Sequence, residues 1–346
     1  MNLSVAERQF LMTLELFEQN PTYSATGEKL PPNIETLRKH AAQIFKILFI
    51  EKLEESTFDK VTIDNLIDKG LLEQNEDIFT LTKSGLTSAK LARKSSLDKS
   101  YSDRLIRSCE SKTYSIIREK VYGKNLCQLN MMTMSQLTIL IDVLALSSDD
   151  TVLDLGCGIG KITECLSDLT KASIIGVDIA SGAIESALDR TRGKRNRIEF
   201  RVDDMDDLSL PPSSVNCIIA IDTLYFVENL ETTIKQMKLI LKPNGRMGLF
   251  YSEICAPKGS KEILQPNKTK LAEALKKNEL NFKTIEFTES EKKLWNRLKQ
   301  LYEDLETDFQ EEGNHDLWKK SYQETLSLVK AYEEGRCRRY LYNVKL

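Results

Sequence analysis

Histidine, long apolar runs and closely spaced cysteines are all scarce in this chain, and each shortage removes a class of protein. Only His40 and His315 occur among the 346 residues, so a histidine base has two candidate positions. The seven cysteines are widely spaced and form no C-x-x-C pair, which argues against a zinc or redox motif. No apolar run is long enough to span a bilayer. We therefore expect a cytoplasmic protein with reduced cysteines, no bound metal and no membrane segment.

Neither sign of charge dominates, because 49 Lys and Arg stand against 52 Asp and Glu. A nucleic-acid-binding surface needs a basic footprint that neutralises phosphates, so we expect no nucleic-acid partner. The first seven residues lack the basic region and apolar core of a secretory signal, and none is expected. The length of 346 residues is typical of two domains, or of three small ones.

The most informative stretch is the run TVLDLGCGIG at residues 151–160. An apolar segment is followed by glycines at alternate positions, Gly156, Gly158 and Gly160, and then by apolar residues at helical spacing. This pattern predicts a buried strand, a tight glycine turn and a helix. Glycines allow a ligand to approach the backbone closely, and the start of the helix presents unpaired N–H groups. The stretch is therefore a candidate nucleotide-binding site.

Two features of this stretch argue against a dinucleotide. The third glycine of a dinucleotide fingerprint is expected at position 161, which is lysine. An acid, Asp154, stands two residues before the first glycine, where it suits a ligand with a positive amino group and no phosphate. The run from Asp154 to Gly160 resembles the first motif of class I S-adenosylmethionine-dependent methyltransferases.

The downstream sequence strengthens this resemblance. A second strand, SIIGVD, ends in Asp178, 18 residues after Gly160, near the interval at which an acid meets a ribose hydroxyl. Further strands are predicted at 197–202, 215–221 and 247–251, the last after the turn-forming run LKPNGR. The resemblance implies an α/β fold with a Rossmann-like seven-stranded sheet, and S-adenosyl-L-methionine as cofactor.

The resemblance also implies a set of cofactor-binding residues. In the acidic run after the third strand, the acid that accepts the adenine amino group corresponds to Asp204, and its neighbour is Met205. The segment before the first strand often closes over the cofactor in this family, which implicates Tyr122, Gln128 and the methionines Met131 and Met132; both methionines can equally be core filler. The full predicted set is Tyr122, Gln128, Met132, Asp154, Gly156, Cys157, Gly158, Asp178, Ile179, Asp204, Met205 and Asp222.

Residues 1–95 form a predicted N-terminal domain that is mainly helical. Its helix, Lys-Gly-Leu, hairpin and second helix between residues 61 and 93 are similar to a winged helix-turn-helix module. Such modules either read DNA or mediate dimerisation and shape a substrate pocket. Residues 1–100 carry 13 Lys and Arg against 15 Asp and Glu, which favours the second use and a homodimer. A polar link at 94–100 is expected to follow.

Residues 101–346 form the predicted methyltransferase domain. It divides into a cap segment at 101–146 with a long helix over 101–121, a core at 147–288, a helical insertion at 289–335 and a last strand at 337–346. The insertion contains two charged amphipathic helices, predicted at 291–309 and 317–332. Because ligands bind outside the carboxyl ends of such strands, the insertion is a candidate lid over the crevice; the alternative is a purely structural bundle. We expect it to meet the 122–132 segment over the cofactor's methyl group.

Methyl transfer requires an aligned nucleophile and, where the nucleophile is protonated, a base. The candidates at the mouth of the site are Tyr225, Tyr251 and Glu253, and His315 is the candidate base in the insertion. The run DTLYFVE after the fourth strand departs from the Asn-or-Asp-Pro-Pro-aromatic motif of amino-directed nucleic-acid and protein-glutamine methyltransferases. We therefore predict transfer to an N or O atom of a small molecule. The alternatives are a winged-helix DNA-binding regulator that uses the fold as a ligand sensor, and an RNA or protein methyltransferase.

Overall fold

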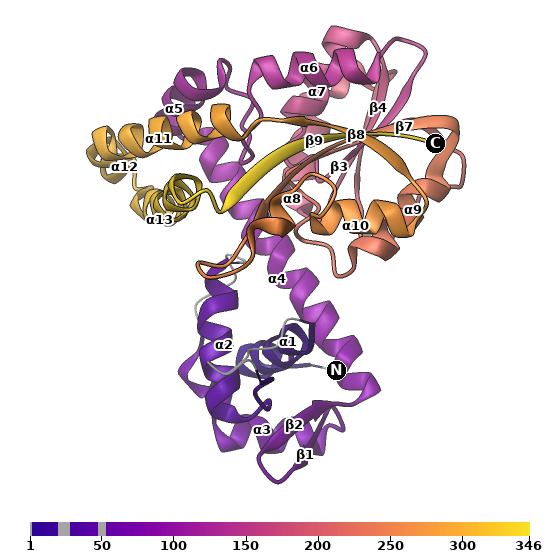
Figure 1. Cartoon of the computed structure of the whole chain (residues 1–346). Coiled ribbons are helices and arrows are strands. Elements are labelled where there is room, and N and C mark those ends of the chain that lie inside the picture. Colours follow the sequence, from indigo (N-terminus) through magenta and orange to yellow (C-terminus); the bar gives the residue numbers. More distant parts are fainter. Residues whose placement is uncertain (1, 20–27, 48–52) are drawn as a thin grey trace. The chain divides into compact units, whose positions relative to one another are not determined.

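The computed structural model describes residues 2–19, 28–47 and 53–346, and the chain divides into two compact units, 1–102 and 103–346. The predicted helix break at 20–27 lies outside the described residues. The larger unit carries a seven-stranded sheet in the order β5-β4-β3-β6-β7-β9-β8. Figure 1 shows this sheet with helices around it. None of the helices in the described ranges is long and apolar enough to cross a membrane.

The smaller unit consists of helices around a two-stranded hairpin. Its elements are α1 (Val5–Gln19), α2 (Ile34–Ile47), α3 (Lys60–Asp68), β1 (Leu72–Asn75), β2 (Ile78–Leu81) and the start of α4 (Lys83–Glu110). Phe10, Leu14 and Phe17 of α1 fall on one face and enter its core, as their helical spacing predicts. The predicted helix-hairpin-helix order is confirmed, while its assignment as a winged helix stays a prediction.

The predicted polar link at 94–100 was wrong. This segment lies inside α4, a single helix of 28 residues, and the division between the two units falls within the same helix. The predicted long helix over 101–121 is instead the end of α4 followed by α5 (Lys112–Tyr122). The break occurs where the Ser111 side chain accepts a hydrogen bond from the Tyr114 N–H and so begins a new helix.

The sheet of the larger unit is built from the segments that the sequence predicted. Its strands are β3 (Thr151–Leu155), β4 (Ser173–Asp178), β5 (Ile198–Val202), β6 (Val215–Ile221), β7 (Leu241–Ile254), β8 (Asn281–Glu286) and β9 (Cys337–Lys345). Only β9 runs antiparallel to its neighbours β7 and β8. The predicted turn before the fifth strand is an irregularity within β7, where Leu241 pairs with Val215 and Arg246 with Cys217. The predicted α/β fold class is confirmed.

Helices cover both faces of this sheet. Helices α6 (Met134–Leu144) and α7 (Lys161–Thr170) pack on one face around Val152 and Ile219. On the other face, α9 (Leu230–Ile240) and α10 (Lys270–Lys277) pack around Leu153 and Leu155. Helix α8 (Ser181–Arg190) packs on β5. The alternation along β3 sends its side chains to opposite faces, so Asp154 faces α7.

The insertion between β8 and β9 holds α11 (Thr288–Asp304), α12 (Glu306–Glu311) and α13 (His315–Glu333), one more helix than predicted. Because Cys337, the first residue of β9, pairs with Ile254, the last of β7, the insertion lies at the carboxyl ends of the parallel strands. Figure 1 shows α11–α13 gathered beside α5 at this end of the sheet. Tyr114 and Tyr122 share one buried cluster with Leu298 and Phe309. The cap segment and the insertion therefore pack together, while their position over the cofactor's methyl group stays a prediction.

Candidate active site

The glycine loop after β3 has the shape that its sequence requires. Gly156, Gly158 and Gly160 all have positive φ, between 54° and 71°, which glycine adopts at little cost. A Cβ at Gly156 would lie 2.4 Å from Cγ2 of Thr223, so no larger residue fits there. The Gly156 and Cys157 N–H groups donate to the Val177 carbonyl at 2.8 and 3.0 Å. These bonds fix the loop against the end of β4.

Asp178 is placed at the end of β4 beside this loop. Its carboxylate accepts hydrogen bonds from the Gly158 N–H at 2.7 Å and the Ala180 N–H at 2.9 Å. The next residue, Ile179, is half-buried. The carboxylate thus lies at the edge of the loop, and its contact with a ribose stays a prediction. These residues fit the cofactor that the motif implies, because the loop is open to close approach and an acid borders it.

Asp154 makes a different contact from the one predicted for a ligand's amino group. Its side chain is buried and accepts a hydrogen bond from the Thr163 hydroxyl at 2.6 Å. Burial raises the pKa of this carboxyl to about 6, although the Thr163 bond opposes the rise. The observed contact ties β3 to the first turn of α7, which positions the glycine loop between them.

The acidic loop after β5 folds on itself. Asp204 accepts the Asp206 N–H at 2.9 Å and forms an isolated bridge with Asp207. Its neighbour Met205 is half-buried and packs against the core cluster beneath β3. The loop therefore lies at the carboxyl edge of the sheet, beside the strand that carries Asp178.

Asp222 at the end of β6 belongs to a buried ionic cluster. Its two oxygens accept bonds from Arg339 at 3.2 and 2.6 Å, and the Met131 N–H donates to it at 3.3 Å. Arg339 also pairs with Glu291 of the insertion at 2.6 Å. Burial raises the pKa of the Glu291 carboxyl despite the nearby arginine. The cluster joins the end of β6, the cap segment and the insertion.

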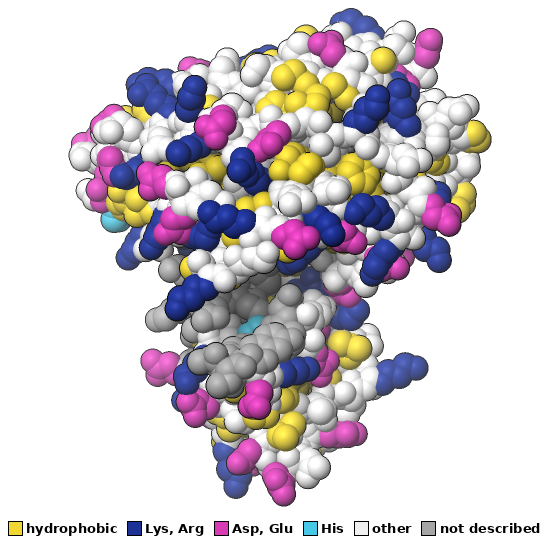
Figure 2. Space-filling model, in the orientation of Figure 1, with side chains coloured by type: hydrophobic (Ala, Val, Ile, Leu, Met, Phe, Trp, Pro, Cys, Tyr) yellow, Lys and Arg dark blue, Asp and Glu magenta, His cyan; other side chains and the backbone are white. Residues whose placement is uncertain are grey.

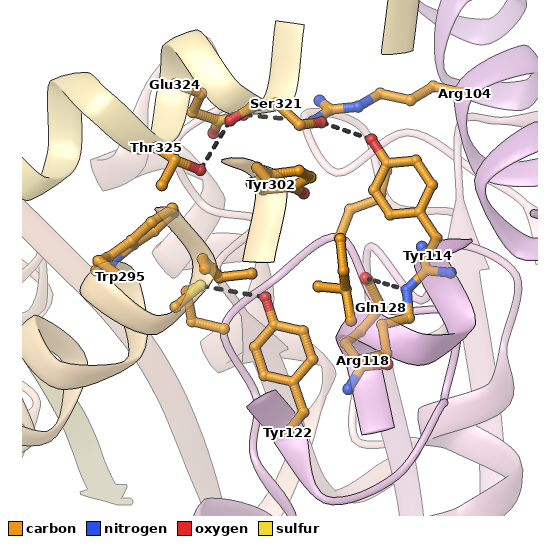
Figure 3. A pocket seen from close by; sticks show the side chains of 14 residues that line it. Arg104, Tyr114, Arg118, Tyr122, Gln128, Trp295, Tyr302, Ser321, Glu324 and Thr325 are labelled. Carbon is orange, nitrogen blue, oxygen red and sulfur yellow. Dashed lines mark hydrogen bonds and ion pairs between the residues drawn. The ribbon is translucent and has the colours of Figure 1, made fainter. Parts of the chain in front are cut away.

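The predicted cap residues lie together but contact mainly one another. The Gln128 amide bonds to the backbone of residues 124, 126 and 132, and the Tyr122 hydroxyl donates to Met131 Sδ at 3.5 Å. Met132 is buried in the cluster under α6, which agrees with the alternative that it is core filler. Tyr122 and Gln128 line a small cavity between the cap and the insertion, shown in Figure 3.

The four candidate catalytic residues do not form one site, although Tyr225 and Tyr251 contact each other. Tyr225 is 40% exposed, while its hydroxyl accepts a bond from the Ser252 N–H at 2.6 Å and donates to Asp222 at 3.3 Å. Burial and the Asp222 charge raise the pKa of this hydroxyl, so it stays protonated and cannot serve as the base. Tyr251 is buried, with its ring centroid 4.8 Å from that of Tyr225. The exposed surface of the Tyr225 ring is what this pair offers to a ligand.

Glu253 and His315 are both engaged elsewhere. The buried Glu253 carboxylate accepts the Lys270 N–H at 2.7 Å and so caps the start of α10. His315 stacks on Trp318 and contacts Glu306 at 3.1 Å, both within the insertion. None of these contacts joins Glu253 or His315 to the glycine loop. Their surroundings therefore give no support for a role in catalysis.

Sequence analysis missed three features of this region. Arg339 and Arg118 are both buried, and a disulfide joins Cys109 to Cys127. The prediction of a fully reduced chain was therefore wrong for this pair, while the other cysteines are free. A signal for Arg118 existed, since it shares a helical face with Tyr114, Ile117 and Val121.

The sheet order, the glycine loop and the acids at successive strand ends together define the class I methyltransferase fold. A sequence profile described as "Methyltransferase domain" matches residues 146–321, just over half of the chain. The chain belongs to this family of S-adenosylmethionine-dependent methyltransferases, and the predicted class and cofactor are confirmed.

Curated relatives cover only part of the chain. It is 30% identical over 112 residues to methyltransferase GfsG of Streptomyces halstedii, which is 32% of this chain and 40% of the relative. It is 25% identical over 145 residues to phosphoethanolamine N-methyltransferase 3 of Arabidopsis thaliana, or 42% of this chain and 29% of that protein. The chain thus spans less than half the length of these relatives.

Solved structures share the fold at low sequence identity. Phosphoethanolamine N-methyltransferase 2 of Haemonchus contortus, in complex with phosphomonomethylethanolamine and S-adenosylhomocysteine, matches with a TM-score of 0.57 and 16% identity. The match covers 71% of this chain and 60% of that one. The [4+2]-cyclase SpnF matches with a TM-score of 0.52 and 15% identity, over 61% of this chain and 79% of that one. The fold alone therefore does not decide the reaction.

Proposed function

We propose that this protein transfers a methyl group from S-adenosylmethionine to an N or O atom of a small molecule. The observation that carries the proposal is the packing of α5 against α11–α13 at the carboxyl ends of the strands, where these helices share one buried cluster. The cavity between the cap segment and the insertion has a volume of only about 40 Å³. A cavity of this size takes one small group of an acceptor, and neither a folded protein nor a structured RNA fits there.

The surface supports the same choice of acceptor. On the face of the larger unit shown in Figure 2, Lys and Arg side chains are interspersed with Asp and Glu. A continuous basic surface, which nucleic acid needs, is not seen on this face. We also propose that residues 1–95 bind no DNA and contribute to a homodimer.

The chain's own residues supply position and exclusion of water. When bound, S-adenosylmethionine supplies an electrophilic methyl carbon on a sulfonium ion. Gly156, Gly158 and Asp178 are placed to hold it, and Tyr225 offers its ring to the acceptor, where an aromatic face attracts a cationic amine. The cap and insertion exclude water from the displacement. Because the Tyr225 hydroxyl, Glu253 and His315 are engaged elsewhere, alignment and not a strong base is the main contribution we assign to the protein.

Two assays test this proposal. Calorimetry should show binding of S-adenosylmethionine and S-adenosylhomocysteine, and mass spectrometry should show methyl transfer to at least one member of a small-molecule panel. The panel contains phosphoethanolamine and 27-O-demethylrifamycin SV, chosen from the names of similar methyltransferases, together with metabolite extracts. Fragmentation of the product distinguishes N- from O-methylation.

The controls address the alternative functions. Cofactor binding without any methylated product, together with tight and salt-dependent binding of duplex DNA, would favour the regulator. Methylation of bulk RNA or of protein, with no small-molecule product, would contradict the proposal. Size-exclusion chromatography of the full chain checks the homodimer.

A further inference from the structure

Helix α5 carries a guanidinium into the interior of the cap. Arg118 is only 2% exposed and lies on the same helical face as Tyr114 and Ile117. A buried charge is costly unless an opposite charge or a full set of hydrogen bonds compensates it. The hydrogen-bond partners of Arg118 therefore show whether its charge is compensated within the protein.

Every oxygen that Arg118 contacts is neutral. Its Nη1 donates to the Ser108 carbonyl at 2.6 Å, Nη2 to the Ser108 hydroxyl at 3.0 Å, and Nε to the Gln128 carbonyl at 3.1 Å. These bonds use three of the five N–H donors of a guanidinium. The guanidinium carbon of Arg118, Cζ, lies 5.1 Å from the centre of the Tyr114 ring. Among the described residues, no carboxylate pairs with it, so its charge is not compensated.

The cavity beside Arg118 has the size of a small anionic group. It lies between α5, the 128–131 segment and the insertion, and Arg104, Trp295 and Glu324 also line it (Figure 3). Its volume of about 40 Å³ accommodates roughly three or four water-sized atoms. Arg104 pairs with Glu324 at 3.3 Å, so these two charges offset each other and the cavity keeps the positive charge of Arg118.

Helix α4 connects Arg118 with the cofactor loop. A Cβ at Gly158 would be 3.3 Å from the Leu105 side chain, and Leu105 stands one helical turn before Ser108, which holds Arg118. Arg118 and the glycine loop therefore both contact the last two turns of α4.

We propose that Arg118 binds an anionic oxygen group, a carboxylate or a phosphate, carried by the methyl acceptor. The inference rests on the proposed function and deepens it by giving the acceptor's charge. A guanidinium with free donors matches the geometry of both groups. The unreactive end of the acceptor is thus fixed by charge, while its nucleophile lies toward the cofactor.

The test measures anion binding to the complex of the full chain with S-adenosylhomocysteine, in which the cofactor's own carboxylate is already placed. The probes are inorganic phosphate, acetate and phosphoethanolamine, titrated by calorimetry. The variant is Arg118→Gln. The matched control is Arg197→Gln, because Arg197 also donates to the carbonyl and hydroxyl of one serine, Ser167, but has a carboxylate partner in Asp168.

We expect the wild-type complex to bind phosphate or acetate and Arg118→Gln to weaken this at least about tenfold, the loss expected for one charge-assisted hydrogen bond. Arg197→Gln should bind as the wild type does, and Arg118→Gln should keep its affinity for S-adenosylhomocysteine within about twofold. Which anion binds more tightly distinguishes a phosphorylated from a carboxylated acceptor. Equal losses for S-adenosylhomocysteine and phosphate would mean that Arg118 serves the cofactor, which overturns the proposal.

A second measurement does not require Arg118 to be replaced. Both tryptophans lie in the larger unit, and Trp295 lines the cavity. Phosphate should change the emission of the Trp318→Phe variant saturably and leave that of Trp295→Phe unchanged. A wild-type complex that binds S-adenosylhomocysteine but no anion would refute this inference and leave the proposed methyl transfer standing.

Discussion

Replacing Arg339 with methionine removes the cation that Asp222 and Glu291 share. Glu291 is fully buried, and its Oε2 has no hydrogen-bond partner in the structure. Breaking a buried ion pair from one side costs about 3–5 kcal/mol, since the remaining charge is left without compensation. For a unit of this size, 1 kcal/mol shifts the melting temperature by roughly 2–4 °C, so we expect a fall of about 6–20 °C.

The assay follows tryptophan fluorescence during thermal and urea unfolding, because both tryptophans report on the larger unit. The matched control is Arg338→Met on the same strand, whose ion pair with Glu286 is exposed at both ends. Exposed pairs contribute about 0–1 kcal/mol, so this variant should melt near the wild type. Equal shifts for the two variants would refute the reasoning.

The pH dependence gives an independent check. The pKa of Glu291 is already raised by burial, and losing Arg339 raises it further. The folded variant then binds this proton more tightly than the unfolded chain does, so its stability increases as the pH falls. The deficit of Arg339→Met should therefore shrink as the pH falls from neutral toward the ordinary pKa of a glutamate, because Glu291 becomes protonated. A deficit that grows in acid would contradict the assignment.

Three further outcomes are expected. Asp178→Ala should weaken binding of S-adenosylmethionine by about 1.5–3 kcal/mol, the value of a charge-assisted bond, and unchanged affinity by calorimetry would mean that the ribose lies elsewhere. Serine at both Cys109 and Cys127 should lower the free energy of unfolding by about 3 kcal/mol, since the disulfide closes a loop between residues 18 apart; dithiothreitol should reproduce the loss in the wild type and have no effect on the variant. Tyr225→Ala should lower turnover far more than cofactor affinity, whereas Tyr225→Phe, which keeps the ring, should lose less; a similar loss in both parameters for Tyr225→Ala would place the ring against the cofactor.

The parallel core of the larger unit was predictable because its signals are local. A buried strand, a glycine turn and the first turn of the next helix lie within about a dozen residues, and the backbone geometry of Gly156 and Gly158 follows from residue type alone. The same holds for Asp178, whose position at a strand end is fixed by the strand itself. The order of such strands then follows from the family resemblance.

The contacts of the cap were not predictable, because their partners are distant in sequence. The end of α4 is set by Ser111, whose hydroxyl bonds to Glu312 at a separation of 201 residues. Arg339 and Asp222 are 117 residues apart. The polarity of residues 94–100 suggested a link, yet Leu97 continues the apolar spacing of Ala89 and Ala92 and keeps the segment helical.

Asp154 shows that a residue type can be predicted while its contact is not. An acid before the glycines was expected to meet a ligand's amino group, and the structure turns it toward the Thr163 hydroxyl. Strand alternation sends the side chain at this position to the α7 face. Since Thr163 is buried on the first turn of that helix, the acid positions the loop through the helix.

The two buried arginines of the larger unit, Arg118 and Arg339, differ in the charge of the groups that they contact. Arg339 contacts two carboxylates, so its charge is compensated without a ligand. Arg118 contacts only neutral oxygens, and desolvation lowers its pKa accordingly. A folded protein can bury such a cation when hydrogen bonds use some of its N–H donors, but an anion bound from solution stabilises the charge further. A ligand that brings a carboxylate or phosphate to Arg118 therefore gains affinity that a neutral analogue of the same shape does not.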